Sequence, residues 1–473
     1  MTRSLWTADD AAIATGGTAA IPFVAEGVSI DTRSLQRGDL FIALRGPNHD
    51  GHDHVADAFA RRAAAAMVDS KPPGLPVAAP LVEVRDTREA LYALARAARR
   101  RSRARIVAVT GSVGKTGTKE TLGAVLAAQG STAVSLGNLN NEFGVPLSLA
   151  RMSADVTFGV FEIGMNHSGE IEPLSRLVEP EVAIITTVAA VHLENFESTF
   201  DIADAKAEIF AGMSGGAAVL NRDNPYFPLL VAAAQAAGVS RIISFGAHPE
   251  ALAHLVDSEA DAGGSTVWAR IDGRDLRYRI SIPGRHWVIN SLAVLAAVVG
   301  IGADLEAAAS VLATIEAPAG RGRRLAIDTP DGRIDLIDES YNASPASMRA
   351  AIETLSAIEP NRGGRHIIVF GDMLELGASS ASLHLSLAEP ILRGGIDAVF
   401  TCGTESAALQ QTLPRRLRGG HAATASELAP LVCAALAPGD LIMVKGSRGM
   451  RTDLVVDAIL SLADRPRSAA NGG

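Results

Sequence analysis

The stretch 105–122, RIVAVTGSVGKTGTKETL, carries residue types that suit phosphate chemistry. An apolar run leads into a glycine-rich turn, and Gly114, Lys115 and Thr116 open a segment that can be helical. Glycines let backbone N–H groups approach phosphate oxygens, a lysine supplies a compact charge, and a threonine hydroxyl can hold Mg²⁺. Only two residues separate Gly111 from Gly114, fewer than in the usual phosphate-binding loop, so an ordinary strand–turn–helix is the alternative. We expect a site for ATP or a related nucleotide. The candidate residues are Gly111, Ser112, Val113, Gly114, Lys115, Thr116 and Gly117.

Lysine is rare in this chain. Lysine and arginine together number 43, and only five of these residues are lysines. A lysine kept in an arginine-rich chain suggests a site that needs a compact ammonium or a reactive amine. Lys115 fits the first need, and Lys206 and Lys445 are further candidates. Lys71 precedes two prolines and is typical of a loop.

Composition narrows the class of protein. A chain of 473 residues predicts about three domains, and 48% hydrophobic residues with 4% aromatic residues predict aliphatic cores. The net charge of −9 argues against general nucleic-acid binding. No apolar leader or long apolar span is visible, so we expect no membrane insertion and a cytoplasmic location. Cys402 and Cys433 are too few for a disulfide framework or a structural zinc site.

Two seams divide the chain. The first is the basic run 99–105, which could be a nucleic-acid patch but is more typical of a solvated linker in an acidic protein. The second is the Pro- and Gly-bearing segment 316–322, which follows a helical stretch at 290–315. The expected domains are residues 1–101, 102–316 and 317–473, with a disordered tail from 465.

Apolar runs alternate with helical patterns in the second and third segments, which predicts α/β domains with parallel sheets. The first segment is less regular. The runs that we interpret as strands are 40–44, 64–68, 81–84, 106–109, 157–163, 182–188, 217–220, 241–245, 334–337, 366–370, 398–401 and 441–444.

Three polar residues follow the phosphate loop at the ends of apolar runs, where α/β sheets place ligand sites. Glu162 could face the Mg²⁺ that Thr116 also touches. His192 is either a ligand or a buried, hydrogen-bonded histidine, because imidazole is not a favoured Mg²⁺ ligand. Lys206 lies on a helical pattern, where surface pairing with Asp204 or Glu208 is the simpler interpretation.

Amide side chains mark two further positions. Segment 138–146, NLNNEFGVP, predicts a loop whose Asn140 and Asn141 can hydrogen-bond phosphate, substrate or the protein itself. Asn290 follows Gly284-Arg285-His286 ahead of an apolar helix. It could read an adenine edge from the first helical turn, or it could be a helix cap.

Together these residues resemble the Mur ligase family of peptidoglycan synthesis. The strings TGSVGKTGTKE, GNLNNEFGVP, EIGMN, VHLENF and ADAKAEIF look like that family's phosphate loop, amide loop and metal segments. The resemblance implies a three-domain α/β fold: a small UDP-binding domain, a central ATPase-type parallel-sheet domain, and a C-terminal Rossmann-like domain. It also implies two Mg²⁺ ions, one held by Thr116 and Glu162 and the other by His192 and Lys206. Lys206 would carry CO₂ as a carbamate, which only an amine can form, and Lys115, Lys206 and His192 would be catalytic.

Within the family, the strings IDESYNASPASMRAAI, VFGDMLELG and VKGSRGMR look most like the member that joins D-Ala-D-Ala to UDP-MurNAc-tripeptide. Segment 28–46 looks like its UDP-sugar-binding region, and the three histidines of HDGHDH are then loop residues rather than a metal site. By likeness the uridine diphosphate would lie near Ser29, Asp31, Thr32, Arg33 and Arg45. Arg321 and Asp338 would contact ATP, as would Asn290. Asn342, Lys445, Ser447 and Arg448 would face the incoming peptide or the acyl-phosphate.

Two positions depart from the family pattern. Trp287 stands where an asparagine is usual in the adenine-side motif, and it could stack on the base or pack inward. Ser344 stands where a second asparagine is usual. The resemblance implies a monomeric ATP-dependent amide ligase. The alternatives are the sister ligase that adds the third amino acid and a non-catalytic nucleotide-binding protein. The sister ligase's Asp-Asn-Pro-Arg signature is missing, and the similar string at 223–226 falls in the middle domain.

Overall fold

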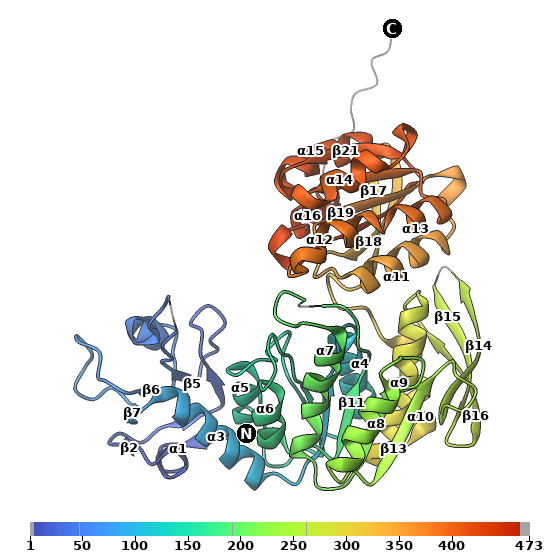
Figure 1. The fold of residues 1–473 in the computed structure, drawn as a ribbon. Coiled ribbons are helices and arrows are strands. Elements are labelled where there is room, and N and C mark those ends of the chain that lie inside the picture. Colours follow the sequence, from blue (N-terminus) through green and yellow to red (C-terminus); the bar gives the residue numbers. More distant parts are fainter. Residues whose placement is uncertain (1–3, 47, 192, 262, 464–473) are drawn as a thin grey trace.

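Three α/β domains follow one another along the chain in the computed structural model, which describes residues 4–46, 48–191, 193–261 and 263–463 (Figure 1). The N-terminal domain lies beside the middle domain, and the C-terminal domain lies above it in this view. The tail expected to be disordered, residues 465–473, lies outside the described residues. No helix in the described ranges is long and apolar enough to cross a membrane. Cys402 and Cys433 form no disulfide within the described chain.

The N-terminal domain is built on a five-stranded sheet in the order β2-β7-β6-β5-β4, parallel except for β2, with a separate β1–β3 pair. Helix α3 begins because the Asp86 carboxylate caps the amides of Arg88 and Glu89, and its Ala/Leu stripe is buried. The elements are β1 (Trp6–Thr7), α1 (Ala8–Thr15), β2 (Thr18–Ala19), β3 (Val24–Ala25), β4 (Gly27–Ser29), β5 (Asp39–Ile42), η1 (Gly51–His54), α2 (Val55–Ala60), β6 (Ala65–Val68), β7 (Leu81–Glu83) and α3 (Thr87–Arg101).

The basic run 99–105 is not the solvated linker that we expected. Its first residues form the last turn of α3, where positive charge suits the helix dipole. Arg99 Nε donates to the Val178 carbonyl at 2.9 Å. The Arg101 guanidinium lies 4.0 Å from the ring centre of Trp6, and Trp6 Nε1 donates to the Ala150 carbonyl at 2.9 Å. These contacts fasten the N-terminal domain to the middle domain.

The middle domain contains a nine-stranded sheet in the order β16-β15-β14-β13-β12-β11-β8-β10-β9. Strands from β9 to β14 are parallel, and β14, β15 and β16 are antiparallel. The elements are β8 (Arg105–Thr110), α4 (Lys115–Ala127), β9 (Thr132–Val134), α5 (Gly144–Ala150), β10 (Phe158–Glu162), α6 (Ile171–Val178), β11 (Val182–Ile185), α7 (Thr199–Ala207), η2 (Glu208–Gly212), β12 (Ala217–Asn221), α8 (Phe227–Ala236), β13 (Arg241–Gly246), β14 (Ala253–Asp261), β15 (Gly264–Ile271), β16 (Arg274–Ile280), α9 (Arg285–Ile301), α10 (Leu305–Val311) and η3 (Leu312–Thr314).

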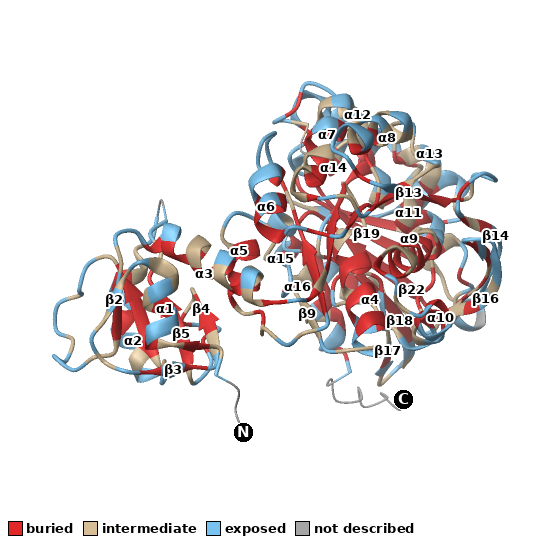
Figure 2. Cartoon of the chain, turned by 90° about the horizontal axis from the view of Figure 1, so that it is seen from below, coloured by how far each residue is buried: buried red, intermediate tan, exposed pale blue. Residues whose placement is uncertain are grey.

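Helices cover both faces of the parallel part of this sheet, so its central strands are buried on both sides (Figure 2). Val107 and Val109 of β8 pack in the cluster that includes α4, α9 and α10, whereas Ile106 and Ala108 pack in the cluster that includes α5 to α8. This double burial explains why β8 is a continuous apolar run, and it fixes the phosphate loop at the end of a rigid strand.

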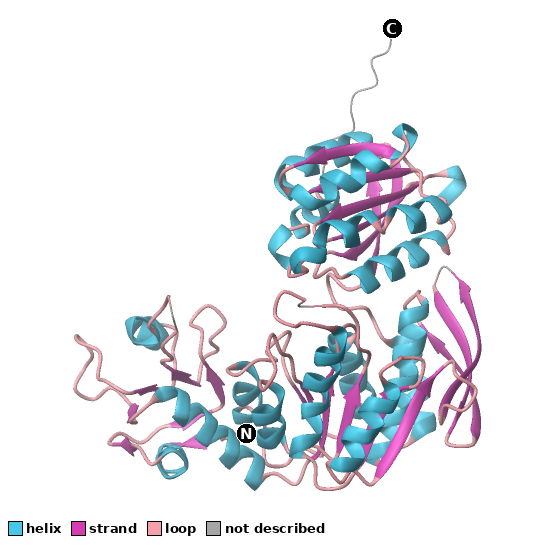
Figure 3. Ribbon diagram, viewed as in Figure 1, coloured by secondary structure: helices cyan, strands magenta, loops and turns pink. Residues whose placement is uncertain are grey.

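The C-terminal domain has a six-stranded sheet in the order β17-β18-β22-β19-β20-β21, parallel except for β17, with helices on both faces (Figure 3). The elements are β17 (Arg323–Thr329), β18 (Gly332–Glu339), α11 (Pro345–Ser356), η4 (Asn361–Gly363), β19 (His366–Gly371), η5 (Gly377–Ser379), α12 (Ser380–Leu385), α13 (Ala388–Arg393), β20 (Ala398–Cys402), α14 (Thr404–Thr412), η6 (Arg415–Leu417), β21 (Arg418–Ala422), α15 (Ala425–Ala435), β22 (Leu441–Lys445), η7 (Arg448–Met450) and α16 (Asp453–Leu460).

Each apolar run interpreted as a strand falls on an observed strand, with ends that differ by a few residues. The predicted helix 290–315 was wrong in two respects. Helix α9 begins earlier, at Arg285, and it ends where Gly302 adopts a left-handed conformation, so α10 is a separate helix.

The linker after η3 joins the C-terminal domain through Asp338 at the end of β18. The Gly320 amide donates to Asp338 Oδ2 at 2.8 Å, and the Gly322 amide donates to the Asp338 carbonyl at 2.8 Å. Residues 320–322 are therefore held against the C-terminal sheet.

Candidate functional site

A cleft of about 1010 Å³ is lined by residues from all three domains. The N-terminal domain contributes Arg88 and Tyr92 of α3. From our candidate set, the lining contains Ser112, Val113, Gly114, Lys115, Thr116, Gly117, Asn140, Asn141, Glu162, Asn290, Arg321, Asn342, Lys445, Ser447 and Arg448.

The phosphate loop connects β8 to α4 and requires glycine at two positions. Gly111 has φ 145° and Gly114 has φ 87°, a region that side chains disfavour. A Cβ on Gly114 would also lie 2.8 Å from Asn290 Nδ2. The Ser112 hydroxyl donates to the Ala189 carbonyl at 3.0 Å, which fastens the loop to the segment after β11. The loop therefore presents the N-terminus of α4 toward the cleft.

Lys115 reaches back over the loop. Its Nζ donates to the Gly111 carbonyl at 2.6 Å. Burial lowers the pKa of Lys115; the Glu162 carboxylate opposes this shift and the Arg321 guanidinium adds to it. Arg321, from the linker, is thus near enough to act electrostatically on the phosphate loop.

Thr116 and Glu162 meet as the sequence led us to expect. Glu162 is 2% exposed, its Oε2 accepts the Thr116 hydroxyl at 2.8 Å, and its Oε1 accepts the Asn140 amide at 2.8 Å. Strands β8 and β10 are parallel neighbours, which brings the loop after one and the last residue of the other to the same edge. Hydroxyl and carboxylate oxygens are ligands that Mg²⁺ prefers, so this pair fits one such ion.

Lys206 is not the surface residue of our simpler interpretation. It is 2% exposed on α7, whereas Asp204 is exposed and the Glu208 carboxylate accepts backbone amides at the start of α6. Burial lowers the pKa of Lys206 well below its ordinary value, and the Lys115 ammonium lowers it further. An amine with a lowered pKa is neutral and nucleophilic over a wider pH range, as carbamate formation requires.

His192 lies outside the described residues. Among the described residues, no group of three His, Cys, Asp or Glu side chains could hold a metal ion. A second ion beside Lys206 therefore fits this chain only if the lysine becomes an anion or if His192 contributes.

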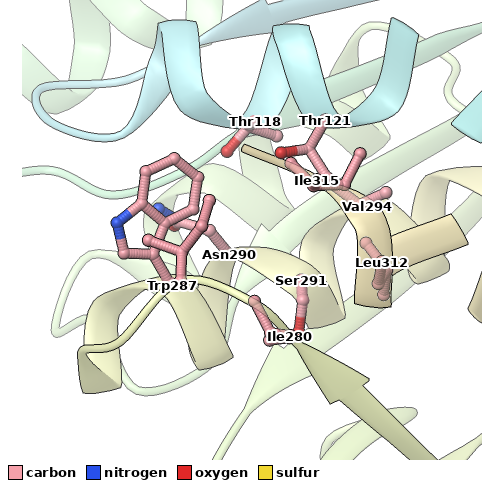
Figure 4. Close-up of a pocket in the computed structure, with 10 residues that line it drawn as sticks. Thr118, Thr121, Ile280, Trp287, Asn290, Ser291, Val294, Leu312 and Ile315 are labelled. Atoms are coloured by element: carbon pink, nitrogen blue, oxygen red, sulfur yellow. The ribbon is translucent and has the colours of Figure 1, made fainter. Parts of the chain in front are cut away.

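Trp287, at the position where we expected adenine, packs inward (Figure 4). It is 7% exposed, and its ring edge lies 2.8 Å from where a Cβ on Gly117 would stand. The ring belongs to the apolar wall between α9 and α4. Asn290 lies in the second turn of α9, because the helix begins at Arg285, so the helix-cap interpretation was wrong. Asn290 itself lines the cleft.

Tyr341 lies between two arginines of the C-terminal domain. The Arg321 guanidinium is 4.0 Å from the ring centre, and that of Arg448 is 5.3 Å away and donates to the phenol oxygen at 3.0 Å. Tyr341 thereby orients two cations of the cleft.

Lys445, at the end of β22, is 3% exposed. Its Nζ donates to Glu339 Oε2 at 2.9 Å and to the Asn342 carbonyl at 3.0 Å. Ser447 accepts the Leu374 amide at 2.9 Å. The Lys445 bonds join the end of β22 to the end of β18 and the loop after it, and the Ser447 bond joins the loop after β22 to the loop after β19.

The candidate Asp338 and Ser344, which departs from the family pattern, both have structural partners, although Ser344 also lines the cleft. Asp338 does not line the cleft: its carboxylate accepts the Gly320 amide and the Ser340 amide and hydroxyl. Ser344 begins α11 as its N-cap, accepting the Ser347 amide at 3.3 Å.

The five residues predicted to lie near uridine diphosphate are in the N-terminal domain and do not line the cleft. Ser29 and Thr32 are buried. Asp31 forms an ion pair with Arg33, which lowers the pKa of Asp31, while Arg45 pairs with carboxylates of its own domain. His52 is buried and its ring nitrogens bond to Asp50 and the Asp69 amide, while His49 and His54 are exposed. The loop interpretation holds for His49 only, because His52 and His54 lie on η1.

Sequence reasoning missed Glu339, Tyr341 and Arg88. Glu339 ends an apolar strand, a signal that we applied to Glu162 but not here. Arg88 pairs with Glu142 of the amide loop at 3.1 Å, across two domains, and no local pattern indicates that contact.

The string at 223–226 is a structural loop after β12. The Asp223 carboxylate accepts the Ala247 amide at 2.7 Å and the His248 amide at 2.8 Å. The Asp223 carboxylate therefore stabilises the turn after β13.

Comparison with known proteins gives three family matches in chain order. Residues 24–99 match the Mur ligase family catalytic domain, 109–298 the Mur ligase middle domain, and 322–448 the Mur ligase glutamate ligase domain.

Full-length relatives agree. The chain is 34% identical over 454 residues to the UDP-N-acetylmuramoyl-tripeptide–D-alanyl-D-alanine ligase of Rickettsia prowazekii, covering 96% of this chain and 99% of the relative. It is 36% identical over 437 residues to the ligase of the same name from Escherichia coli K12, covering 92% and 93%. The crystal structure of MurF from Acinetobacter baumannii superposes with a TM-score of 0.82 at 28% identity, covering 96% of this chain and 99% of that one. The chain belongs to the Mur ligase family.

Proposed function

We propose that this chain is the ATP-dependent ligase that joins D-alanyl-D-alanine to UDP-MurNAc-tripeptide in peptidoglycan precursor synthesis. The observation that carries the proposal is the cleft shared by three domains, whose lining includes the phosphate loop, the buried Glu162 carboxylate and cations of the C-terminal domain. The names of the relatives support this choice over the sister ligase.

In the proposed reaction, the γ-phosphoryl group of ATP passes to the terminal carboxylate of the tripeptide, giving an acyl-phosphate and ADP. The amine of D-Ala-D-Ala attacks the acyl carbon, and the tetrahedral intermediate collapses with loss of phosphate. Lys115 and the amides of the phosphate loop bind the phosphates and offset the charge of the transferring group. Arg321 approaches the same group from the linker.

Thr116 and Glu162 would hold one Mg²⁺, and His192 with carbamoylated Lys206 a second. Bound there, the ions would neutralise charge on the phosphates. The chain's part in the carbamate is to keep the Lys206 amine buried beside Lys115, which favours the neutral form that CO₂ needs.

The substrates are assigned by position. We propose that Ser29, Asp31, Thr32, Arg33 and Arg45 bind the uridine diphosphate, with Asn140 and Asn141 toward the tripeptide. Asn290 would contact adenine, and Asp338 would act on ATP only by holding the linker that carries Arg321. Asn342, Lys445, Ser447 and Arg448 would meet the dipeptide or the acyl-phosphate. We keep 1–101, 102–316 and 317–473 as the proposed domains, and a cytoplasmic monomer as the proposed form.

The test measures phosphate release from ATP with UDP-MurNAc-tripeptide, comparing D-Ala-D-Ala with diaminopimelate, lysine and D-glutamate as amine donors. We expect release only with D-Ala-D-Ala, with a product of matching mass. Release with another acceptor and donor pair would assign the chain to a sister step. ATP binding without release for any pair would favour the non-catalytic binder.

A second measurement tests Lys206. Lys206→Ala and Lys206→Arg should abolish phosphate release while nucleotide still binds. Full turnover by wild-type enzyme in buffer stripped of CO₂, bicarbonate and other carboxylic acids would exclude the carbamate.

A further inference from the structure

Lys119 is a fully buried lysine that the proposed reaction does not use. It lies one turn after Thr116 on α4, with an exposed fraction of 0%. Its Nζ donates to the Ser135 carbonyl at 2.7 Å, the Gly137 carbonyl at 3.1 Å and Glu120 Oε1 at 2.5 Å. Burying an ammonium is costly unless its donors are satisfied, and here all three are.

Ser135 links this lysine to Glu162. The residue follows β9 and is 1% exposed. While its carbonyl accepts the Lys119 ammonium, its hydroxyl accepts the Glu162 amide at 3.1 Å. One buried residue thus contacts both the lysine and the backbone of the metal carboxylate.

Gly137 links the same lysine to the amide loop. Gly137 directly precedes 138–146, and Asn140 of that loop donates to Glu162 Oε1 at 2.8 Å. The Gly164 amide donates to the Asn140 carbonyl at 2.8 Å, which closes the ring of contacts behind Glu162. Lys119 therefore holds the start of a loop whose side chain orients the carboxylate.

We propose that Lys119 is a positioning residue that sets the Glu162 carboxylate against Thr116 through Ser135 and the amide loop. The inference rests on the proposed Mg²⁺ role of that pair. Partners behind a metal ligand fix its orientation, and their loss typically weakens metal binding about 10–100-fold. A surface lysine on the same helix would have no such effect.

The experiment compares Lys119→Met with Lys71→Met, which removes an exposed loop lysine. Methionine keeps the length and apolar character of the stem and removes the three donors. Mn²⁺ binding to the ADP complex is measured by titration calorimetry, and metal-free ADP binding is measured separately. Circular dichroism checks that each variant is folded.

We expect Lys119→Met to bind Mn²⁺ about 10-fold more weakly than Lys71→Met. Its metal-free ADP affinity should stay within about twofold, because Lys115 and the loop amides are unchanged. A role confined to stability would lower the unfolding temperature and leave the Mn²⁺ affinity of the folded protein unchanged. Folded Lys119→Met with Mn²⁺ affinity within about twofold of the control would overturn the proposal.

If Lys119→Met does not fold, Ser135→Ala tests the proposal instead, since it removes only the hydroxyl that accepts the Glu162 amide. Weaker Mn²⁺ binding by that variant supports the inference, and unchanged binding overturns it. Failure of the proposed function would be seen differently: wild-type protein would release no phosphate with any substrate pair, while the Mn²⁺ comparison would still decide the role of Lys119.

Discussion

Replacing Lys445 with methionine would leave the half-buried Glu339 carboxylate without its cation. The side chains are 4% and 14% exposed, and the two bonds of Nζ measure 2.9 and 3.0 Å. Removing one partner of a buried ion pair typically costs about 3–5 kcal/mol. We expect about 3 kcal/mol, because water can reach Glu339 more easily than Lys445.

Hydrogen exchange of peptides from β18 and β22, followed by mass spectrometry, measures this loss locally. A loss of about 3 kcal/mol corresponds to exchange faster by about 100-fold. The matched variant is Lys445→Met with Glu339→Gln, which leaves no buried charge unpaired. It should recover most of the lost protection, to within about 1 kcal/mol of wild type. Phosphate release should not recover, because the cleft still lacks the ammonium.

Two results would refute this reasoning. Exchange in Lys445→Met that matches wild type would mean that the pair contributes nothing to stability. Phosphate release restored in the double variant would mean that Lys445 serves only as a counter-ion for Glu339, and the assignment of Lys445 to the substrate would fall.

Two further variants test the site, and a third tests the contact between the N-terminal and middle domains. Burial lowers the pKa of Lys206 in the native chain. At pH values between this lowered pKa and the ordinary value of about 10.4, the unfolded chain binds more protons than the native chain. The free energy of unfolding of the wild-type protein therefore rises with pH in that range, by up to about 1.4 kcal/mol per pH unit. Lys206→Met lacks this rise, so its thermal unfolding midpoint, measured without CO₂ or metal, should be higher than that of wild type at neutral pH and equal to it at alkaline pH. Midpoints of the two proteins that change with pH in the same way would contradict a buried amine. Trp287→Ala should lower the free energy of unfolding by about 3–5 kcal/mol, since the ring fills the space over Gly117, and a loss under about 1 kcal/mol in denaturant unfolding would contradict that packing. Trp6→Phe leaves the Ala150 carbonyl without its donor. Hydrogen exchange in α1 and α5 should become faster, by the factor that corresponds to a loss of about 1–3 kcal/mol in stability. Unchanged exchange would mean that this hydrogen bond does not couple the two domains.

The sequence predicted the doubly covered parallel strands because such strands must be apolar throughout, as 106–109 is, whereas the parallel strands β4, β9 and β21 were missed. Strands β14, β15 and β16 were missed for the converse reason. Segment 253–261 lies in the antiparallel end of the sheet and exposes charged residues such as Asp257 and Glu259, so its apolar signal is weak. The meeting of Thr116 with Glu162 could be predicted, since both follow ends of apolar runs.

Other parts of the site depend on contacts that no local pattern carries. The helical spacing around Lys206 favoured surface pairing, and only the packing of α7 in the core shows that the amine is buried. The role of Asn290 depended on where α9 begins, and helix ends are the least certain feature of a sequence pattern. The stacking of Tyr341 between Arg321 and Arg448 joins the linker to a loop more than a hundred residues later.

The hydrogen bonds between Asp338 and the linker determine where the chain can bend between the middle and C-terminal domains. Because Gly320 and Gly322 are bonded to β18, they move as part of the C-terminal domain. The last helical turn of the middle domain ends at Thr314, and the Ile315 carbonyl accepts the Ser281 hydroxyl of the same domain, so the pivot is confined to residues 316–319. Arg321 lies on the far side of that pivot and travels with the C-terminal domain. Any rotation of that domain about the pivot therefore moves the positive charge of Arg321 toward the phosphate loop or away from it.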